Sequence, residues 1–139
     1  MTNKEKVSFQ NVQVVVTPSR DAAGAVSYSY TTEPTKLVIT QRDTIINFQL
    51  VLPTPPDVVF TGMTLSPSSR QFSTPTISTD GKNVTISDVN TAVGDFTWNF
   101  AFNGVTATRA SSSTMTLMAT DPDIENRPGS PPPPPPPGP

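Results

Sequence analysis

The stretch DFTWNFAFNGVTATR, residues 95–109, decides the fold of this chain. Phe96, Trp98, Phe100 and Phe102 stand at every second position. A β-strand has a side-chain period of two, so all four rings fall on one face. They are four of the ten aromatic residues and include the only tryptophan. The stripe therefore predicts a strand whose aromatic face packs into a core.

The dipeptide Asn103-Gly104 follows this strand at once. It is the strongest short hairpin signal, because a type I′ turn needs two residues that tolerate positive φ. A two-residue loop sets the register of the returning strand. The predicted pairs are Phe102 with Val105, Phe100 with Ala107, and Trp98 with Arg109.

The Trp98–Arg109 end of this hairpin is a candidate binding surface. A guanidinium over an indole is a favourable cation–π contact, and an exposed tryptophan can stack on a sugar ring or a proline. Tyr28 and Tyr30 are further candidates for such a platform. Four aligned aromatic residues favour burial instead, so we expect the rest of the stripe to be core. The specific prediction is that Trp98 is partly exposed beside Arg109.

The remaining strands are predicted from alternation and from turn residues. We expect strands at 7–17, 25–31, 36–40, 44–52, 57–65, 71–79, 82–87 and 114–120, with a bulge at Gly62 and a second hairpin at Asp80-Gly81. Pro18 is expected to end the first strand. The sequence shows no helical periodicity. These features predict an all-β fold, a single immunoglobulin-like antiparallel β-sandwich of about 7–9 strands. A closed β-barrel is the alternative.

The composition narrows the classes of partner. Up to Thr120 the chain carries eight Lys or Arg and eight Asp or Glu, so the body is neutral, and no basic cluster stands out. Nucleic acids and anionic membranes both require clustered cations, so neither is expected as a partner. The N-terminus has no apolar segment of the kind that a signal peptide needs. The expected location is cytoplasmic.

The chain contains neither cysteine nor histidine. It therefore lacks the commonest general base, the commonest metal ligand and the strongest nucleophile. A glycosidase-like enzyme using only aspartates stays as the last alternative. Its candidate carboxylates are Asp43, Asp57, Asp80, Asp88 and Asp95. Each stands beside a turn or strand end, where aspartate commonly satisfies backbone donors, so we expect no enzyme and no cofactor.

An acidic junction and a proline tail follow the predicted sandwich of residues 1–120. In the junction, residues 121–130, Asp121, Asp123 and Glu125 alternate in a way that weakly suggests a calcium site, but three carboxylates do not supply the six to eight oxygens that calcium takes. The tail, residues 131–139, begins with seven consecutive prolines. They form a polyproline II rod of about 22 Å, which is a candidate contact element. Its residues are Pro131, Pro132, Pro133, Pro134, Pro135, Pro136 and Pro137.

The segment DPDIENRP, residues 121–128, together with the β-rich body before it, resembles the DP-EP family. Asp121-Pro122 matches the first element of that family's motif. The second element departs from it, because Arg127 rather than Glu precedes Pro128, although Glu125 is close by. The resemblance implies a small all-β bacterial domain with no catalytic residues to carry over.

These observations favour a non-enzymatic interaction or assembly module. We expect self-association, or a protein partner that binds through the proline tail. A carbohydrate-binding sandwich, with Trp98 and the tyrosines as stacking platforms, is the alternative.

Overall fold

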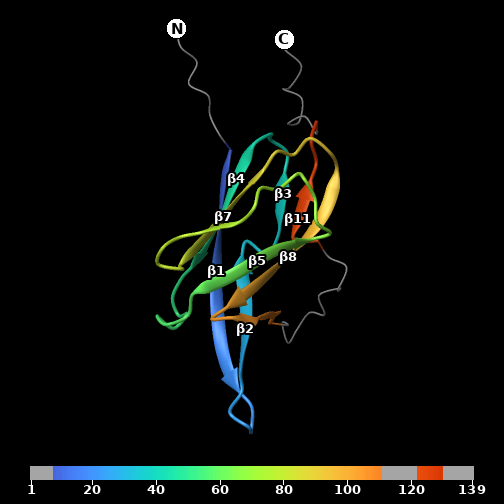
Figure 1. The fold of residues 1–139 in the computed structure, drawn as a ribbon. Coiled ribbons are helices and arrows are strands. Elements are labelled where there is room, and N and C mark those ends of the chain that lie inside the picture. The colour runs from blue at the N-terminus through green and yellow to red at the C-terminus, as the bar shows by residue number, and fades with distance from the viewer. Residues whose placement is uncertain (1–7, 111–121, 130–139) are drawn as a thin grey trace, which may run out of the picture.

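A computed structural model describes residues 8–110 and 122–129 of the chain (Figure 1). The described residues form eleven strands, five of them only two or three residues long. The strands are β1 (Phe9–Arg20), β2 (Val26–Glu33), β3 (Leu37–Ile39), β4 (Thr44–Leu50), β5 (Phe60–Ser66), β6 (Thr76–Ile77), β7 (Asn83–Asp88), β8 (Gly94–Phe102), β9 (Val105–Thr106), β10 (Thr108–Arg109) and β11 (Ile124–Asn126).

The strands lie in two sheets that pack face to face, which confirms the predicted β-sandwich (Figure 1). One sheet has the order β10-β2-β1-β4-β7-β6 and the other β3-β11-β8-β5, with β9 added to β8. The described strands do not close into a barrel. The sheets are mixed rather than purely antiparallel, because β1 and β4, β10 and β2, and β11 and β3 pair in parallel. Parallel neighbours need crossover connections, which the alternation along single strands does not reveal.

The core lies between β8 on one sheet and β1, β2 and β4 on the other. All four rings of the β8 stripe are buried, so the predicted burial of Phe96, Phe100 and Phe102 is confirmed. Phe48 of β4 meets Trp98 and Phe100 edge to face, each at a ring distance of 5.3 Å. Burial of one such ring stabilises the fold by about 1.5–3 kcal/mol. The aromatic stripe is therefore the central contact between the two sheets.

The first strand runs straight through Pro18 and ends at Arg20, so the predicted stop at Pro18 is wrong. The N–H of Val16 points away from β2 and donates to Thr54 Oγ1 at 2.9 Å. Backbone N–H groups alternate in direction along a strand, so the nitrogen of Pro18 also faces away from β2. The missing N–H therefore removes no bond between β1 and β2, which is the position where a strand tolerates proline.

The Asn103-Gly104 turn forms as predicted, with positive φ at both residues and Phe102 paired with Val105. Ala107 then donates to the carbonyl of Phe100 at 2.9 Å. Beyond this point the chain leaves β8 and crosses to the other sheet, where β10 pairs with β2. The predicted pairing of Trp98 with Arg109 is wrong: Trp98 is paired with Leu65, and Arg109 with Tyr30.

Two smaller predictions are confirmed, a third concerns residues outside the described part of the chain, and a fourth is corrected. The pairing of β5 with β8 shifts register between Phe60 and Gly62, which is the expected bulge, and Ile77 pairs with Val84 across the Asp80-Gly81 turn. The predicted strand at 114–120 lies outside the described residues. Residues 121–130 were assigned to a junction, yet Ile124–Asn126 form β11, a central strand of the second sheet.

Candidate functional site

The hairpin of β1 and β2 projects beyond the body of the sandwich as an arm (Figure 1). We use "the arm" for residues 17–28. Every residue from Thr17 to Ala25 is exposed. In the described structure β4 pairs with β1 only as far as Val14, and β10 pairs with β2 only at Ser29 and Tyr30. Residues 17–25 of the arm therefore extend past the flanking strands as a two-stranded ribbon, whereas Tyr28 at the base of the arm is buried and packs against Phe102.

The tip of the arm is a tightly bonded turn. The Asp21 carboxylate accepts the N–H groups of Ala23 and Ala25, both at 2.9 Å. Gly24 adopts a φ of 86° and donates to the Asp21 carbonyl at 3.0 Å. Arg20 Nη1 donates to the Gly24 carbonyl at 3.1 Å. These bonds hold the projecting tip in one shape, so a partner that binds the arm does not have to order it first.

A hollow of about 360 Å³ lies where the arm joins the sandwich. Its volume is at the lower end of the range for ligand sites in proteins. Tyr28 and Val58 are buried residues at its floor, whereas Arg20 and Asp57 are exposed and bring one positive and one negative charge. The lining includes Pro18, Arg20, Val26, Tyr28, Asp57 and Val58.

The Asn103-Gly104 turn is hydrogen-bonded to residues in and beside the lining of the hollow. Asn103 Oδ1 accepts the N–H of Val59 at 3.0 Å, and Gly104 donates its N–H to Thr61 Oγ1 at 2.9 Å. Asn103 Nδ2 donates to the Tyr28 hydroxyl at 3.2 Å. The Tyr28 oxygen is therefore an acceptor toward Asn103, which leaves its own hydrogen able to donate to a ligand.

The predicted aromatic platform is not available on the surface. Trp98 is only 1% exposed, so the prediction that it is partly exposed beside Arg109 is wrong. Tyr30 is buried as well, and burial raises the pKa of its hydroxyl, with the nearby Arg109 acting in the opposite direction. Tyr28 is 9% exposed and is the one tyrosine of the pair that lines the hollow. A sugar-binding role through stacking on these three rings loses its platform.

Arg109 instead forms an ion pair with Asp123, which joins two residues that the sequence had placed in separate candidate sites. Asp123 is buried, and its other carboxylate oxygen accepts the backbone N–H of Trp98 at 2.8 Å. Both oxygens of Asp123 are thus engaged within the fold. The segment just before β11 is in this way bonded to strands of both sheets.

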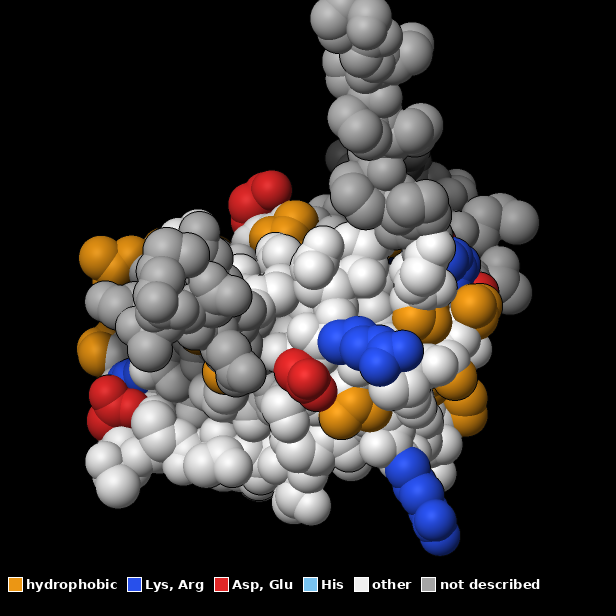
Figure 2. Space-filling model, turned by 90° about the horizontal axis from the view of Figure 1, so that it is seen from above, with side chains coloured by type: hydrophobic (Ala, Val, Ile, Leu, Met, Phe, Trp, Pro, Cys, Tyr) orange, Lys and Arg blue, Asp and Glu red, His pale blue; other side chains and the backbone are white. Residues whose placement is uncertain are grey.

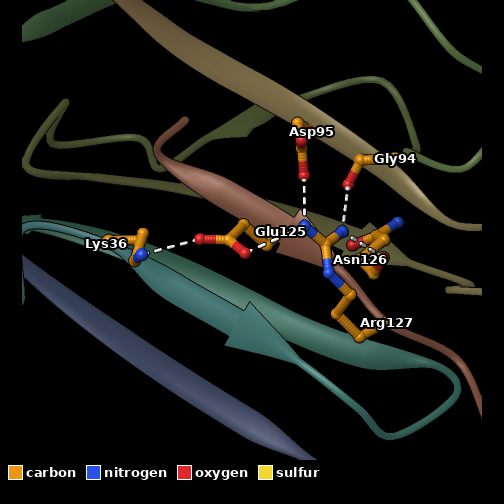
Figure 3. Close-up of polar contacts among 6 residues, drawn as sticks. All are labelled: Lys36, Gly94, Asp95, Glu125, Asn126 and Arg127. Carbon is orange, nitrogen blue, oxygen red and sulfur yellow. Dashed lines mark hydrogen bonds and ion pairs between the residues drawn. The ribbon is translucent and has the colours of Figure 1, made fainter. Parts of the chain in front are cut away.

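Glu125 and Arg127 extend this bonding at the surface of β11 (Figure 3). Glu125 is held between Lys36, whose Nζ lies 2.7 Å away, and Arg127, whose Nη2 lies 2.9 Å away. Arg127 also reaches Asp95 at 2.7 Å and the carbonyl oxygens of Asn126 and Gly94 at 2.8 and 3.3 Å. Its hydrogen bond to Asp95 contributes most to raising the pKa of the Arg127 guanidinium.

These contacts bear on the weak calcium hypothesis. Asp123 and Glu125 both have cationic partners, and Asp121 lies outside the described residues. Among the residues that the structure describes, no group of three or more acidic, histidine or cysteine side chains is arranged to hold a metal ion.

A buried polar cluster of Asp88, Asn90 and Asn126 was missed in the sequence. Asp88 Oδ1 accepts Asn126 Nδ2 at 2.9 Å and the N–H of Asn90 at 3.0 Å. Asp88 Oδ2 and the side-chain oxygens of both asparagines are buried with no hydrogen-bond partner among the described residues. Burial raises the pKa of the Asp88 carboxyl. The signal was present, because alternation places Asp88 on the inward face that Val84 and Ile86 occupy.

The remaining candidate aspartates have structural partners or lie at exposed positions. Asp80 accepts the Ser78 hydroxyl at 2.6 Å and the Lys82 N–H at 3.0 Å, which caps its turn, and the first of these bonds contributes most to lowering the Asp80 pKa. Asp43 and Asp57 are exposed. The residues described include no helix of the length and apolarity needed to cross a membrane.

In the part of the chain that the structure describes, the end of the sandwich opposite the arm shows no single apolar patch. Figure 2 looks onto that end, and its exposed hydrophobic side chains form separate spots with acidic and basic side chains between them. Scattered apolar residues of this kind are normal on a protein surface. The described surface at that end therefore gives no reason to place a contact site there.

The DP-EP family model matches residues 10–128, from β1 to the end of the DPDIENRP segment. The chain belongs to the DP-EP family. None of the curated proteins matches it. The resemblance seen in residues 121–128 is thus confirmed over the whole sandwich. In this DP-EP chain the described part of the segment, Pro122 to Pro128, contributes β11 and the ion pairs around it.

Proposed function

We propose that this DP-EP protein is a non-enzymatic interaction module that self-associates through the arm end of its sandwich. The observation that carries the proposal is the arm with the hollow at its base. The ribbon leaves unpaired edges exposed, and exposed sheet edges pair readily with other chains. The Asp21 turn keeps the arm in one conformation, which lowers the entropic cost of binding.

The position of the arm fits an immunoglobulin-like use of the scaffold. Loops gather at the two ends of such sandwiches, and in antibody variable domains the loops of one end form the binding surface. Here the end with β11 has its charged side chains in contact with one another, whereas the arm end leaves backbone edges and a hollow open. We infer that the arm end is the contact surface.

Charge placed on the arm tests the proposal. Ala22→Lys with Ala23→Lys adds two cations to exposed tip positions beside Asp21, so the fold is expected to stay intact. The control, Ser68→Lys with Thr74→Lys, adds the same charge at exposed positions in the β5–β6 connection. Sedimentation equilibrium measures the mass of each protein against concentration.

We expect the mass of the parent chain and of the control to rise with concentration, and the arm variant to associate at least about tenfold more weakly. A parent chain that stays monomeric, or an arm variant that associates like the parent, would contradict the proposal.

A further inference from the structure

We propose that the hollow at the base of the arm binds the proline tail of a second copy of this chain. The inference rests on the proposed function, because it requires the arm end to be a contact surface. The occupant is the segment Pro131 to Pro137, which lies outside the described residues and begins two positions after the last described residue, Gly129.

The chemistry of the proline segment restricts what can bind it. Proline has no backbone N–H, so seven consecutive prolines offer carbonyl acceptors and apolar rings and no donor. Such a segment cannot fill a sheet edge by the two-way bonding of a strand. It binds in grooves that supply apolar contact together with hydrogen-bond donors, and its preformed polyproline II shape keeps the entropic cost low.

The hollow supplies both requirements. Tyr28, Val26 and Val58 provide apolar surface in its floor and wall. The Tyr28 hydroxyl, which already accepts from Asn103, has its hydrogen available to donate. Arg20 uses Nη1 on the Gly24 carbonyl and carries five N–H donors in all. The lining holds one cation and one anion, Arg20 and Asp57, which suits a neutral ligand better than a charged one.

The reach of the tail makes the hollow of another copy the expected site. The last described residues, which follow β11, and the start of β1 lie at the end of the sandwich opposite the arm (Figure 1). From Phe9 to Pro18 the strand rises about 30 Å, whereas residues 130–137 would span about 25 Å as polyproline II. To reach its own hollow, the tail would have to reverse at Gly129-Ser130 and run back along the whole sandwich. Even then the seven prolines would stop short of the hollow, whereas a neighbouring molecule can present its arm end directly.

A tail at one end and a hollow at the other define a head-to-tail contact. Such a contact is heterologous, so it propagates into open chains or closes into rings of copies instead of stopping at a two-fold dimer. The assembly therefore needs both elements on each molecule, and a mixture of two complementary defective chains should form only pairs.

The first test uses that complementarity. One chain is truncated after Gly129 and keeps its hollow; the other keeps its tail and carries Arg20→Glu, which replaces a donor of the hollow with an acceptor. Arg70→Glu, at an exposed position outside the hollow, is the matched control. We expect each defective chain alone to associate at least about tenfold more weakly than the parent. The mixture should give a one-to-one complex by sedimentation, and the control should associate like the parent.

The second test measures the contact directly. The peptide GSPPPPPPPGP is titrated into the chain truncated after Gly129, and amide resonances of Val26, Tyr28 and Val58 are followed by NMR. A peptide with alternate prolines replaced by glycine is the control. We expect saturable shifts at these residues with the first peptide, at least about tenfold weaker binding of the control, and weaker binding of the first peptide to a Tyr28→Phe chain, which keeps the ring and loses the hydroxyl.

The outcomes separate this inference from the proposed function. If truncation leaves self-association unchanged and the peptide shifts no resonance of the hollow, the tail is not the occupant and the inference is wrong. If the truncated chain still associates and the arm charges still abolish that association, the proposed function stands with a different occupant, such as the arm of another copy. If neither the tail nor the arm affects the mass, both proposals fail.

Discussion

Around β11, side chains bond to one another across both sheets, whereas residues 17–25 of the arm stay open to solvent. Asp123 connects Arg109 to the Trp98 N–H, and Glu125 and Arg127 connect Lys36 to Asp95. In the arm, the bonds of the tip stay within the tip.

The difference separates the region whose contacts join the two sheets from the exposed region in which we propose the contact surface. β11 has only three residues, so it adds few backbone hydrogen bonds to its sheet. The polar contacts around it therefore help to keep it in place. In those contacts the charged side chains of Lys36, Asp95, Glu125 and Arg127 pair with one another. Residues 17–25 of the arm contribute no side chain to the core, so their surface can take part in binding without a loss of stability. The predictions below contrast the packed body of the sandwich, including the region around β11, with exposed positions such as the arm.

The largest expected effect follows from removing the buried carboxylate of Asp123, next to β11. Asp123→Ala leaves the Arg109 guanidinium and the Trp98 N–H without their partner. Breaking a buried ion pair costs about 3–5 kcal/mol, and we expect a loss near the lower value because Arg109 is partly exposed. Urea denaturation measures the free energy of unfolding.

Asp95→Ala is the matched control for that change. It removes an exposed partner of Arg127, and exposed pairs contribute little. If both variants lost the same free energy of unfolding, the buried pair would have no special role in closing the sandwich.

The next largest effect compares two glycines with the same backbone requirement. Gly81 and Gly24 have φ values of 73° and 86°, so alanine is strained at both. An added Cβ at Gly81 would lie 2.6 Å from Val59 Cβ, whereas at Gly24 it would meet nothing within 4 Å. We expect Gly81→Ala to cost about 2 kcal/mol or more, since overpacking adds to the strain.

Gly24→Ala should cost clearly less in a global unfolding experiment, because its strain falls on the arm tip and not on the packed sheets. Thermal denaturation of the two variants side by side measures the difference. Equal losses would mean that the arm unfolds as one unit with the body and is not energetically separate from it.

A third effect appears as a dependence on pH. Burial raises the Asp88 pKa in the folded protein above its ordinary 3.8, so the folded state binds more protons than the unfolded state between the two values. The contribution of Asp88 to stability is therefore present below the unfolded pKa and is lost as pH rises through the folded one. Asp88→Asn keeps an acceptor for Asn126 and removes the titration.

We expect the free energies of unfolding of parent and Asp88→Asn to be closest at low pH, and the variant to gain on the parent as pH rises above about 4. Urea titrations at several pH values give this difference, in which the contributions of other acids cancel. A difference that shrinks with rising pH would show that Asp88 is stabilised in its charged form.

The smallest expected effect concerns local opening. Arm amides beyond Pro18 have exposed surroundings, so their hydrogens should exchange at a free energy well below that of global unfolding. Amides of β8 and β4, which lie in the core contact, should exchange only with global unfolding. Hydrogen exchange followed by NMR measures both sets. Similar protection in both would remove the contrast between the arm and the body.

Particular residues show where prediction from sequence succeeded. The β8 stripe and the turn at Asn103-Gly104 were predictable because a period of two and a need for positive φ act over neighbouring residues. The Trp98–Arg109 pairing failed because the register was extended two residues past Ala107, after which the chain changes sheet. Trp98 was predicted at a rim and lies in the centre, since Phe48 of β4 covers it.

The sequence by itself determined the all-β sandwich, the inward face of β8, two hairpin turns and the family, because each of these depends on spacing or conformation within a short stretch. Only the tertiary structure decided that Arg109 meets Asp123, that Ile124–Asn126 enter the second sheet between β3 and β8, and that Tyr28 lines a hollow beneath a projecting arm. Those features join residues distant in the chain, and their positions depend on which strands pair across the sandwich.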